Sequence, residues 1–115
     1  MVKIPAAIIK TLNDYLRDVE KICHIDKAIL FGSYAHGNIK KRSDIDIAIF
    51  SKQITEDNRL EIMARLIASG GKFKRDIQTM AFPWEDYLSK ENDFIVLIHS
   101  EICLFKEQGP IEGLA

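Results

Sequence analysis

The stretch SDIDIAIF, from Ser43 to Phe50, has the composition of a buried β-strand, yet two aspartates stand at alternate positions near its start. Successive strand residues point to opposite faces, so if the alternating isoleucines face the core, Asp44 and Asp46 share the other face. Their Cα atoms are then roughly 6.6 Å apart, which is two rises of about 3.3 Å. At an effective dielectric of ~20 the two carboxylates repel by on the order of 2.5 kcal/mol. We therefore expect positive charge to compensate this pair.

Upstream of this stretch, residues 27–32 (KAILFG) form a second predicted strand, which Gly32 ends and Ser33 follows. A glycine at the end of a strand lets backbone N–H groups approach a ligand closely, and a serine hydroxyl adds a further polar contact. The pair is therefore a candidate phosphate site, although Gly32 alone could simply form a turn. A Walker P-loop is excluded, because Gly37 is followed by Asn and Ile instead of Lys and Ser or Thr.

Downstream, a helix is predicted to begin at Thr55 and to end at Gly70–Gly71, with a buried stripe of Leu60, Met63 and Ile67. A third predicted strand covers residues 72–80 and contains Asp76.

Three further segments complete the predicted secondary structure. Apolar residues at steps of three and four predict a first helix from Ile4 to Cys23. The stretch 82–88 is expected to be a turn into a short helix, residues 94–98 a second short helix and residues 101–105 a last strand. The resulting order α-β-β-α-β-α-β predicts an α+β fold in which helices pack on a small mixed β-sheet.

The composition describes one domain, residues 1–115, with a net charge of -1. General DNA binding is not expected, because it usually shows a strong basic excess. The two cysteines, Cys23 and Cys103, lie far apart in apolar surroundings and are predicted to be buried free thiols. No stretch approaches the ~18 apolar residues of a membrane span, so we expect a cytoplasmic protein that does not bind membranes.

The three aspartates suit a metal centre. Mg²⁺ prefers oxygen ligands and is commonly held by one or two carboxylates together with substrate phosphates. If the strand with Asp76 lies beside the strand with Asp44 and Asp46, the three carboxylates can hold two ions roughly 3.5–4 Å apart. The alternative is that Asp44 and Asp46 simply face water on an exposed strand.

The stretch GSYAHGNIKKRSDIDIAI, residues 32–49, resembles the Gly-Ser-(about ten)-Asp-x-Asp signature of the DNA polymerase β-like nucleotidyltransferase superfamily. The greatest similarity is to its minimal nucleotidyltransferases, the MNT group. The resemblance covers most of the chain. It implies that Gly32, Ser33, Asp44 and Asp46 bind the nucleotide and that Asp44, Asp46 and Asp76 bind two Mg²⁺ ions. It also implies that these three aspartates are catalytic, with Asp76 on the acceptor side.

The resemblance also implies a partner and a substrate. The MNT group acts with a separate helical HEPN protein as a toxin–antitoxin pair. The present chain is then the antitoxin, which transfers AMP from ATP to a tyrosine hydroxyl of its partner. Two alternatives stay open: a binding module that neutralises the partner by complex formation, and a small-molecule nucleotidyltransferase of the aminoglycoside-modifying kind. A homodimer is a further possibility that the sequence leaves open.

Several polar and aromatic residues remain ambiguous. His36 stands where family members often carry Arg or Lys, and it is equally compatible with a phosphate contact and with a solvated loop. The basic run 40–42 fits a solvated turn better than a triphosphate contact. Trp84 and Tyr87 could stack on a base, but they are expected instead to pack in the core or to form a partner surface. His24 has no metal-ligand spacing and is expected to be structural.

Overall fold

The computed structural model describes residues 5–32, 44–73, 76–89, 92–98, 102–106 and 109–110, the last two ranges as backbone only. Its helices and strands are α1 (Ala6–Ile22), β1 (Lys27–Phe31), β2 (Ile45–Ser51), α3 (Arg59–Gly70), β3 (Ile77–Pro83), α4 (Trp84–Ser89), α5 (Asp93–Ile98), β4 (Ile102–Lys106) and β5 (Gly109–Pro110). Within these ranges, no helix is both long and apolar enough to cross a membrane.

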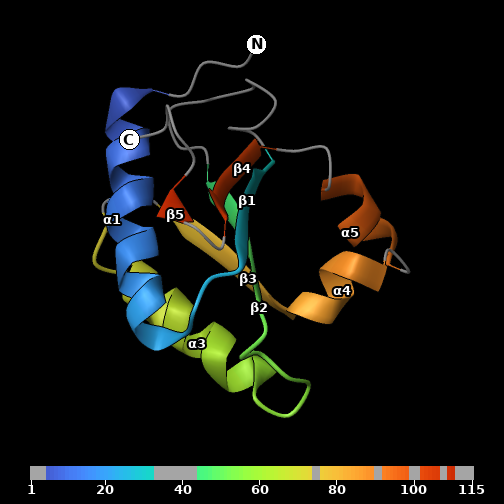
Figure 1. Cartoon of the computed structure of the whole chain (residues 1–115). Helices are drawn as coiled ribbons and strands as arrows, with labels where there is room; N and C mark the ends of the chain where they lie inside the picture. The colour runs from blue at the N-terminus through green and yellow to red at the C-terminus, as the bar shows by residue number, and fades with distance from the viewer. Residues whose placement is uncertain are drawn as a thin grey trace.

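The five strands form one sheet in the order β3-β2-β1-β4-β5. β2 and β3 run parallel, whereas β1 pairs with both β2 and β4 in antiparallel fashion. A parallel pair needs a crossover connection, and α3 supplies it between β2 and β3. Figure 1 shows α1 and α3 on one side of the sheet and α4 and α5 on the other. The predicted α+β class with a small mixed sheet is therefore confirmed.

Each face of the sheet carries its own hydrophobic core. The isoleucines of β2 are fully buried in the first core, under α1 and α3. Ala48 and Phe50, at the alternate positions of the same strand, belong to the second core with residues of α4 and α5. The register predicted for β2 is thus confirmed, and Asp46 lies on the face that carries the second core.

The predicted buried stripe of α3 is wrong at two of its three positions. Leu60 is 71% exposed and Ile67 is 49% exposed, and only Met63 packs against the core. The helix instead buries Ile62 and Leu66. Apolar residues occur on two sides of this helix, and the side that faces the sheet is fixed by contacts with β3 and α1, which helical periodicity alone does not reveal.

Three element boundaries differ from the prediction. α3 begins at Arg59, because Thr55 and Asn58 bond to each other in a preceding turn: each backbone N–H donates to the other side chain, at 2.7 and 3.3 Å. β3 runs from Ile77 to Pro83, so Asp76 lies immediately before this strand and not inside it. α4 then follows β3 directly, without the predicted turn. The end of α3, the helix α5 and the strand β4 agree with the prediction.

Candidate active site

Asp44 and Asp46 lie at the start of β2, beside the end of β1. Asp46 pairs with Phe31, the last residue of β1, in the antiparallel register. Gly32 follows Phe31 and therefore also lies close to Asp46. Gly32 has a φ of 76°, which is a left-handed conformation that favours glycine. A Cβ atom built at Gly32 would overlap the carboxylate oxygen Oδ2 of Asp46. The glycine of the sequence motif therefore lies directly against the second aspartate, and a side chain there would be strained by the positive φ and would displace the Asp46 carboxylate.

The parallel pairing of β2 and β3 brings Asp76 to the same edge of the sheet. The backbone N–H of Ile45 donates to the carbonyl of Asp76 at 2.8 Å, and Ile45 pairs with Ile77. Asp76 is therefore next to Asp44 in the register, one position before the strands begin. Asp44 and Asp76 are exposed, and Asp46 is half-buried. The predicted neighbourhood of the three aspartates thus agrees with the backbone.

The side chains themselves do not enclose a ready-made metal site. Within the described ranges, no three His, Cys, Asp or Glu residues are arranged so that they could hold one ion. Burial raises the pKa of Asp46, and the nearby Asp44 carboxylate raises it further. Asp44 and Asp46 are thus the two acids that interact electrostatically. The described part of the chain has no cation that forms an ion pair with Asp44 or Asp46.

The donor set at this edge nevertheless fits a hard divalent cation. Two carboxylates that repel each other offer oxygen ligands and negative charge, and Mg²⁺ usually adds phosphate and water oxygens to such a pair. Asp44 and Asp46 would hold the ion, and the positive charge would remove the repulsion between them. Asp76 adjoins Asp44 in the backbone register.

Several sequence predictions fall outside the described residues. They concern Ser33, His36, the basic run 40–42 and the side chain of Cys103.

The aromatic residues of α4 pack as expected. The rings of Trp84 and Tyr87 stack on each other, with centroids 5.2 Å apart and planes at 18°. Tyr87 also meets the edge of Phe50 in the second core, and its hydroxyl accepts a hydrogen bond from Lys27 Nζ at 2.6 Å. These contacts hold α4 on the sheet, so core packing explains both residues.

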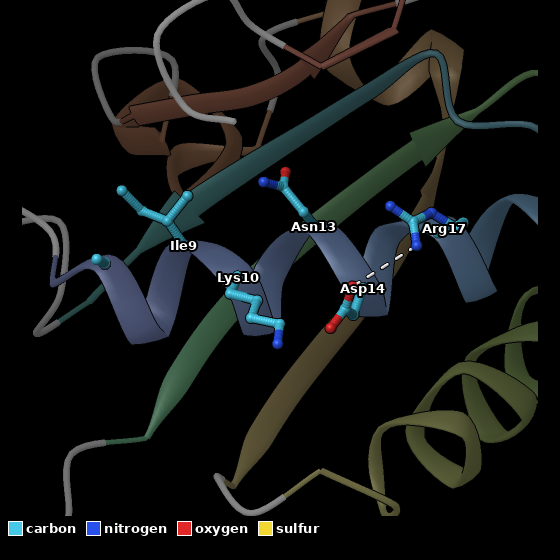
Figure 2. A pocket seen from close by; sticks show the side chains of 6 residues that line it. Ile9, Lys10, Asn13, Asp14 and Arg17 are labelled. Carbon is cyan, nitrogen blue, oxygen red and sulfur yellow. Dashed lines mark ion pairs between the residues drawn. The ribbon is translucent and has the colours of Figure 1, made fainter.

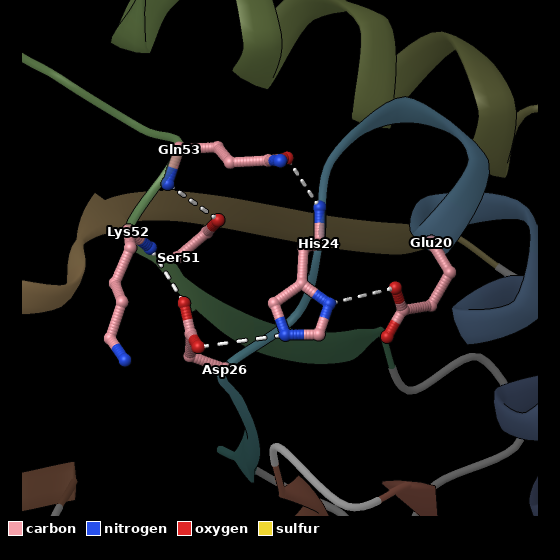
Figure 3. A network of polar contacts seen from close by, with 6 residues as sticks. All are labelled: Glu20, His24, Asp26, Ser51, Lys52 and Gln53. Carbon is pink, nitrogen blue, oxygen red and sulfur yellow. Dashed lines mark hydrogen bonds and ion pairs between the residues drawn. The ribbon is translucent and has the colours of Figure 1, made fainter.

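His24 and Cys23 have structural surroundings, as predicted. Figure 3 shows His24 between two carboxylates: Nδ1 is 3.5 Å from Glu20 and Nε2 is 3.6 Å from Asp26. Asp26 is buried and also accepts a hydrogen bond from the backbone N–H of Lys52 at 2.6 Å. Cys23 is a buried free thiol, and burial raises its pKa to about 11. This thiol is therefore protonated at neutral pH.

Hollows in the described part of the chain include one on α1 and one beside Asp76. The larger, of about 360 Å³, lies on α1 beside the ion pair of Asp14 and Arg17, and the residues that Figure 2 draws around it all come from that one helix. It contains none of the predicted site residues. The smaller, of about 230 Å³, lies between the end of α3 and the start of β3, and Asp76 is part of its lining. Nothing in the sequence pointed to this cavity, because Gly70–Gly71 by itself indicates only a helix end.

Comparison with known proteins gives consistent results. Residues 9–107 match the family described as "Polymerase beta, Nucleotidyltransferase". A protein of Methanocaldococcus jannaschii, provisionally named a protein adenylyltransferase, is 33% identical over 72 residues, which are 61% of this chain and 72% of the relative. A crystal structure from Sulfolobus solfataricus, provisionally described as a nucleotidyltransferase, superposes with a TM-score of 0.64 over 97% of this chain and 98% of the other, at 18% identity. The last similarity concerns the fold alone.

Proposed function

The chain belongs to the polymerase β nucleotidyltransferase family, and from this premise we propose that it transfers AMP from ATP to a hydroxyl of a partner protein. The observation that carries the proposal is the Asp46 carboxylate against Gly32, with Asp44 two residues before it and Asp76 beside Asp44 in the strand register. The family fixes the general reaction. The protein acceptor is supported by the name of the relative from Methanocaldococcus jannaschii.

Each residue at the sheet edge around Asp46 has its own role in the proposed reaction. Asp44 and Asp46 bind Mg²⁺, which neutralises the negative charge of the triphosphate when it is bound. Gly32 leaves room for the Asp46 carboxylate and lets the backbone after β1 approach the phosphates. Asp76 accepts the proton of the attacking hydroxyl. The hydroxyl oxygen then forms a bond to the α-phosphorus, the bond from that phosphorus to the bridging oxygen breaks, and pyrophosphate leaves.

We further propose that the partner is a helical HEPN protein and that the chain acts as its antitoxin. One observation favours an alternative, a binding module without catalytic activity: among the described residues, the three aspartate side chains do not converge on a single point. A binding module that neutralises the partner without transfer would need no such convergence.

The test is nucleotide transfer to the product of the adjacent open reading frame. The two purified proteins are mixed with ATP and Mg²⁺, and intact mass spectrometry looks for a mass increase of one AMP unit on the partner. Asp44→Asn and Asp46→Asn should each lower the transfer rate by on the order of 10²–10³-fold, as when a group that stabilises transition-state charge is removed. Asp57→Asn, in the exposed turn before α3, is the matched control and should transfer normally.

Three results would contradict the proposal in different ways. No adduct with the wild-type protein favours the binding module. An adduct that survives both substitutions refutes the metal ligands. Asp76→Asn should lower the transfer rate by about 10²–10⁴-fold, as for loss of a general base, while ATP binding changes little. An equal loss of ATP binding would contradict its role on the acceptor side.

A further inference from the structure

The side of α3 that faces away from the sheet is largely apolar. The only charged residues among the exposed positions of this helix are Glu61 and Arg65. Its other exposed residues follow one another at i, i+4, i+7 and i+8 and form a single stripe, which we call the α3 stripe: Leu60, Ala64, Ile67 and Ala68. The solvent side of a surface helix usually carries polar residues, so a continuous exposed apolar stripe indicates an interaction surface.

The α3 stripe has the relief that a second helix needs for close packing. Leu60 is 71% exposed and Ile67 is 49% exposed, and both project from the helix. Ala64 and Ala68 are short and leave room between these two side chains. Large side chains of one helix pack into the grooves between side chains of a facing helix. In an antiparallel pair of α3 helices centred on Ala64, Leu60 of each copy therefore lies over Ala68 of the other.

The charges beside the α3 stripe complement each other in the same antiparallel pair. Glu61 and Arg65 lie on one flank of the stripe, and neither forms an ion pair with another described residue. A twofold axis perpendicular to the two helices brings this flank of both copies to the same side. Glu61 of each copy then lies beside Arg65 of the other, which gives two pairs of opposite charge.

The other large exposed apolar side chains are less suited to self-association. They are Leu88 on α4 and Leu97 on α5. The described charged residues of these two short helices are all acidic: Glu85, Asp86 and Asp93. Two copies that met through this face would bring like charges together, which is unfavourable. Charge therefore favours α3 as the face that binds a second copy.

We propose that the α3 stripe is the interface of a homodimer, in which the α3 helices of two copies pack antiparallel about a twofold axis beside Ala64. Figure 1 shows α3 on the opposite side of the sheet from α4 and α5, and Asp46 lies on the α4 and α5 side, so this pairing leaves the Asp46 face open. Ile67 also lines the hollow beside Asp76, so the second copy borders that hollow. The dimer goes beyond the proposed function and does not depend on it.

The first experiment is sedimentation velocity of the full chain over a range of concentrations. One helix pair buries less surface than the roughly 800 Å² per partner of a standard interface, so we expect a dissociation constant of roughly 10–100 µM. The protein should therefore be monomeric at about 1 µM and largely dimeric at about 500 µM. A wild-type protein that stays monomeric throughout this range would overturn the inference.

Ala64→Lys tests where the contact lies. The position is exposed and helical, so the variant should fold, which circular dichroism checks. It places two like charges across the twofold axis and should weaken dimerisation at least about 10-fold. Ala7→Lys adds the same side chain at an exposed position of α1 and, as the matched control, should dimerise like wild type. If Ala64→Lys does not fold, Ile67→Lys takes its place.

A charge exchange tests the antiparallel arrangement. Glu61→Arg and Arg65→Glu should each weaken dimerisation at least about 5-fold, because each turns two opposite-charge pairs into like-charge pairs. The variant with both substitutions regains the two opposite-charge pairs and should dimerise like wild type. If the double variant is as weak as the single ones, the antiparallel pairing is refuted.

Two further outcomes would assign the contacts differently. A dimer that a folded Ala64→Lys leaves unchanged would use another face, such as that of Leu88 and Leu97, and would overturn the inference. If the wild-type protein is monomeric and Ala64→Lys loses binding of the partner protein, the α3 stripe binds that partner and the homodimer is refuted. Transfer of AMP to the partner is measured separately, so its failure would leave the dimer untouched.

Discussion

At the scale of single residues, the site around Gly32 and Asp46 lowers the folding stability of the protein, and its proposed function explains why. A half-buried carboxylate that lies near a second carboxylate is disfavoured in the charged form, and this is why the pKa of Asp46 is raised. Gly32 accepts a left-handed conformation and has no side chain, which leaves this carboxylate its space. The cost is reasonable if Asp46 binds a cation as proposed, because the cation would offset the repulsion between the two carboxylates.

Asp46→Asn should therefore stabilise the metal-free protein at pH 7. Because the folded protein holds the Asp46 proton more tightly than the unfolded chain does, ionisation of Asp46 costs stability as the pH rises through the raised pKa. The gain should stay below about 1 kcal/mol, since solvent screens a half-exposed pair. Urea unfolding at pH 7 in EDTA measures it, and the difference from wild type should vanish near pH 3. A loss of stability at pH 7 would contradict the repulsion.

At the scale of elements, α3 carries apolar residues on two sides and uses only one of them for the fold. Ile62 and Leu66 are buried, and Gly70 lets the end of the helix approach Tyr15 and Ile77 closely. The opposite side leaves Leu60 and Ile67 exposed, and Ile67 lines the cavity beside Asp76. The helix thus connects the core with the hollow beside Asp76.

Truncation of the two sides of α3 should have very different effects on stability. Leu66 is 0% exposed, so Leu66→Ala leaves a cavity and should lower the free energy of unfolding by about 2–5 kcal/mol. Leu60 is largely exposed, so Leu60→Ala should change it by less than about 0.5 kcal/mol. Chemical denaturation of both variants measures the difference. Equal losses would mean that α3 is rotated relative to this description.

At the scale of the whole molecule, Tyr15 connects three elements from distant parts of the sequence. Its hydroxyl donates to the carbonyl of Leu66 on α3 at 2.9 Å and lies 2.6 Å from the hydroxyl of Thr79 on β3. The side chain is 0% exposed and comes from α1. Because one proton already goes to Leu66, Thr79 is the donor in the second bond. This arrangement fixes α1 and α3 against the strand that follows Asp76.

Tyr15→Phe should lower the free energy of unfolding by about 1–3 kcal/mol, because it leaves buried polar groups on two elements without their partner. Burial raises the pKa of Tyr15, so the folded state holds the phenol proton more tightly. Its contribution is therefore complete below the unfolded pKa of about 10 and falls as the pH rises above it. Thermal unfolding between pH 8 and 11 should show a steeper loss for wild type than for Tyr15→Phe; identical slopes would contradict this.

Features that depend on neighbouring residues in the sequence were predicted better than features that depend on contacts between distant residues. The mixed sheet and the buried face of β2 were predicted correctly, because strand alternation is a local property. The common face of Asp44 and Asp46 stays a prediction, since Asp44 precedes β2. The buried side of α3 was predicted wrongly, because two apolar sides satisfy the same helical period and the choice depends on β3 and Tyr15. The start of β3 was placed too early by five residues, since strand ends depend on the partner strand.

By itself, the sequence determined that alternating isoleucines bury one face of a strand and leave Asp46 on the other, and that a glycine ends the preceding strand. Only the tertiary structure decided that Gly32 lies against Asp46, that Asp76 stands beside Asp44, and that a cavity opens next to it. The physical reason is that alternation within a strand needs only the strand's own backbone. Register between parallel strands and the closing of a cavity need contacts between residues that are far apart along the chain.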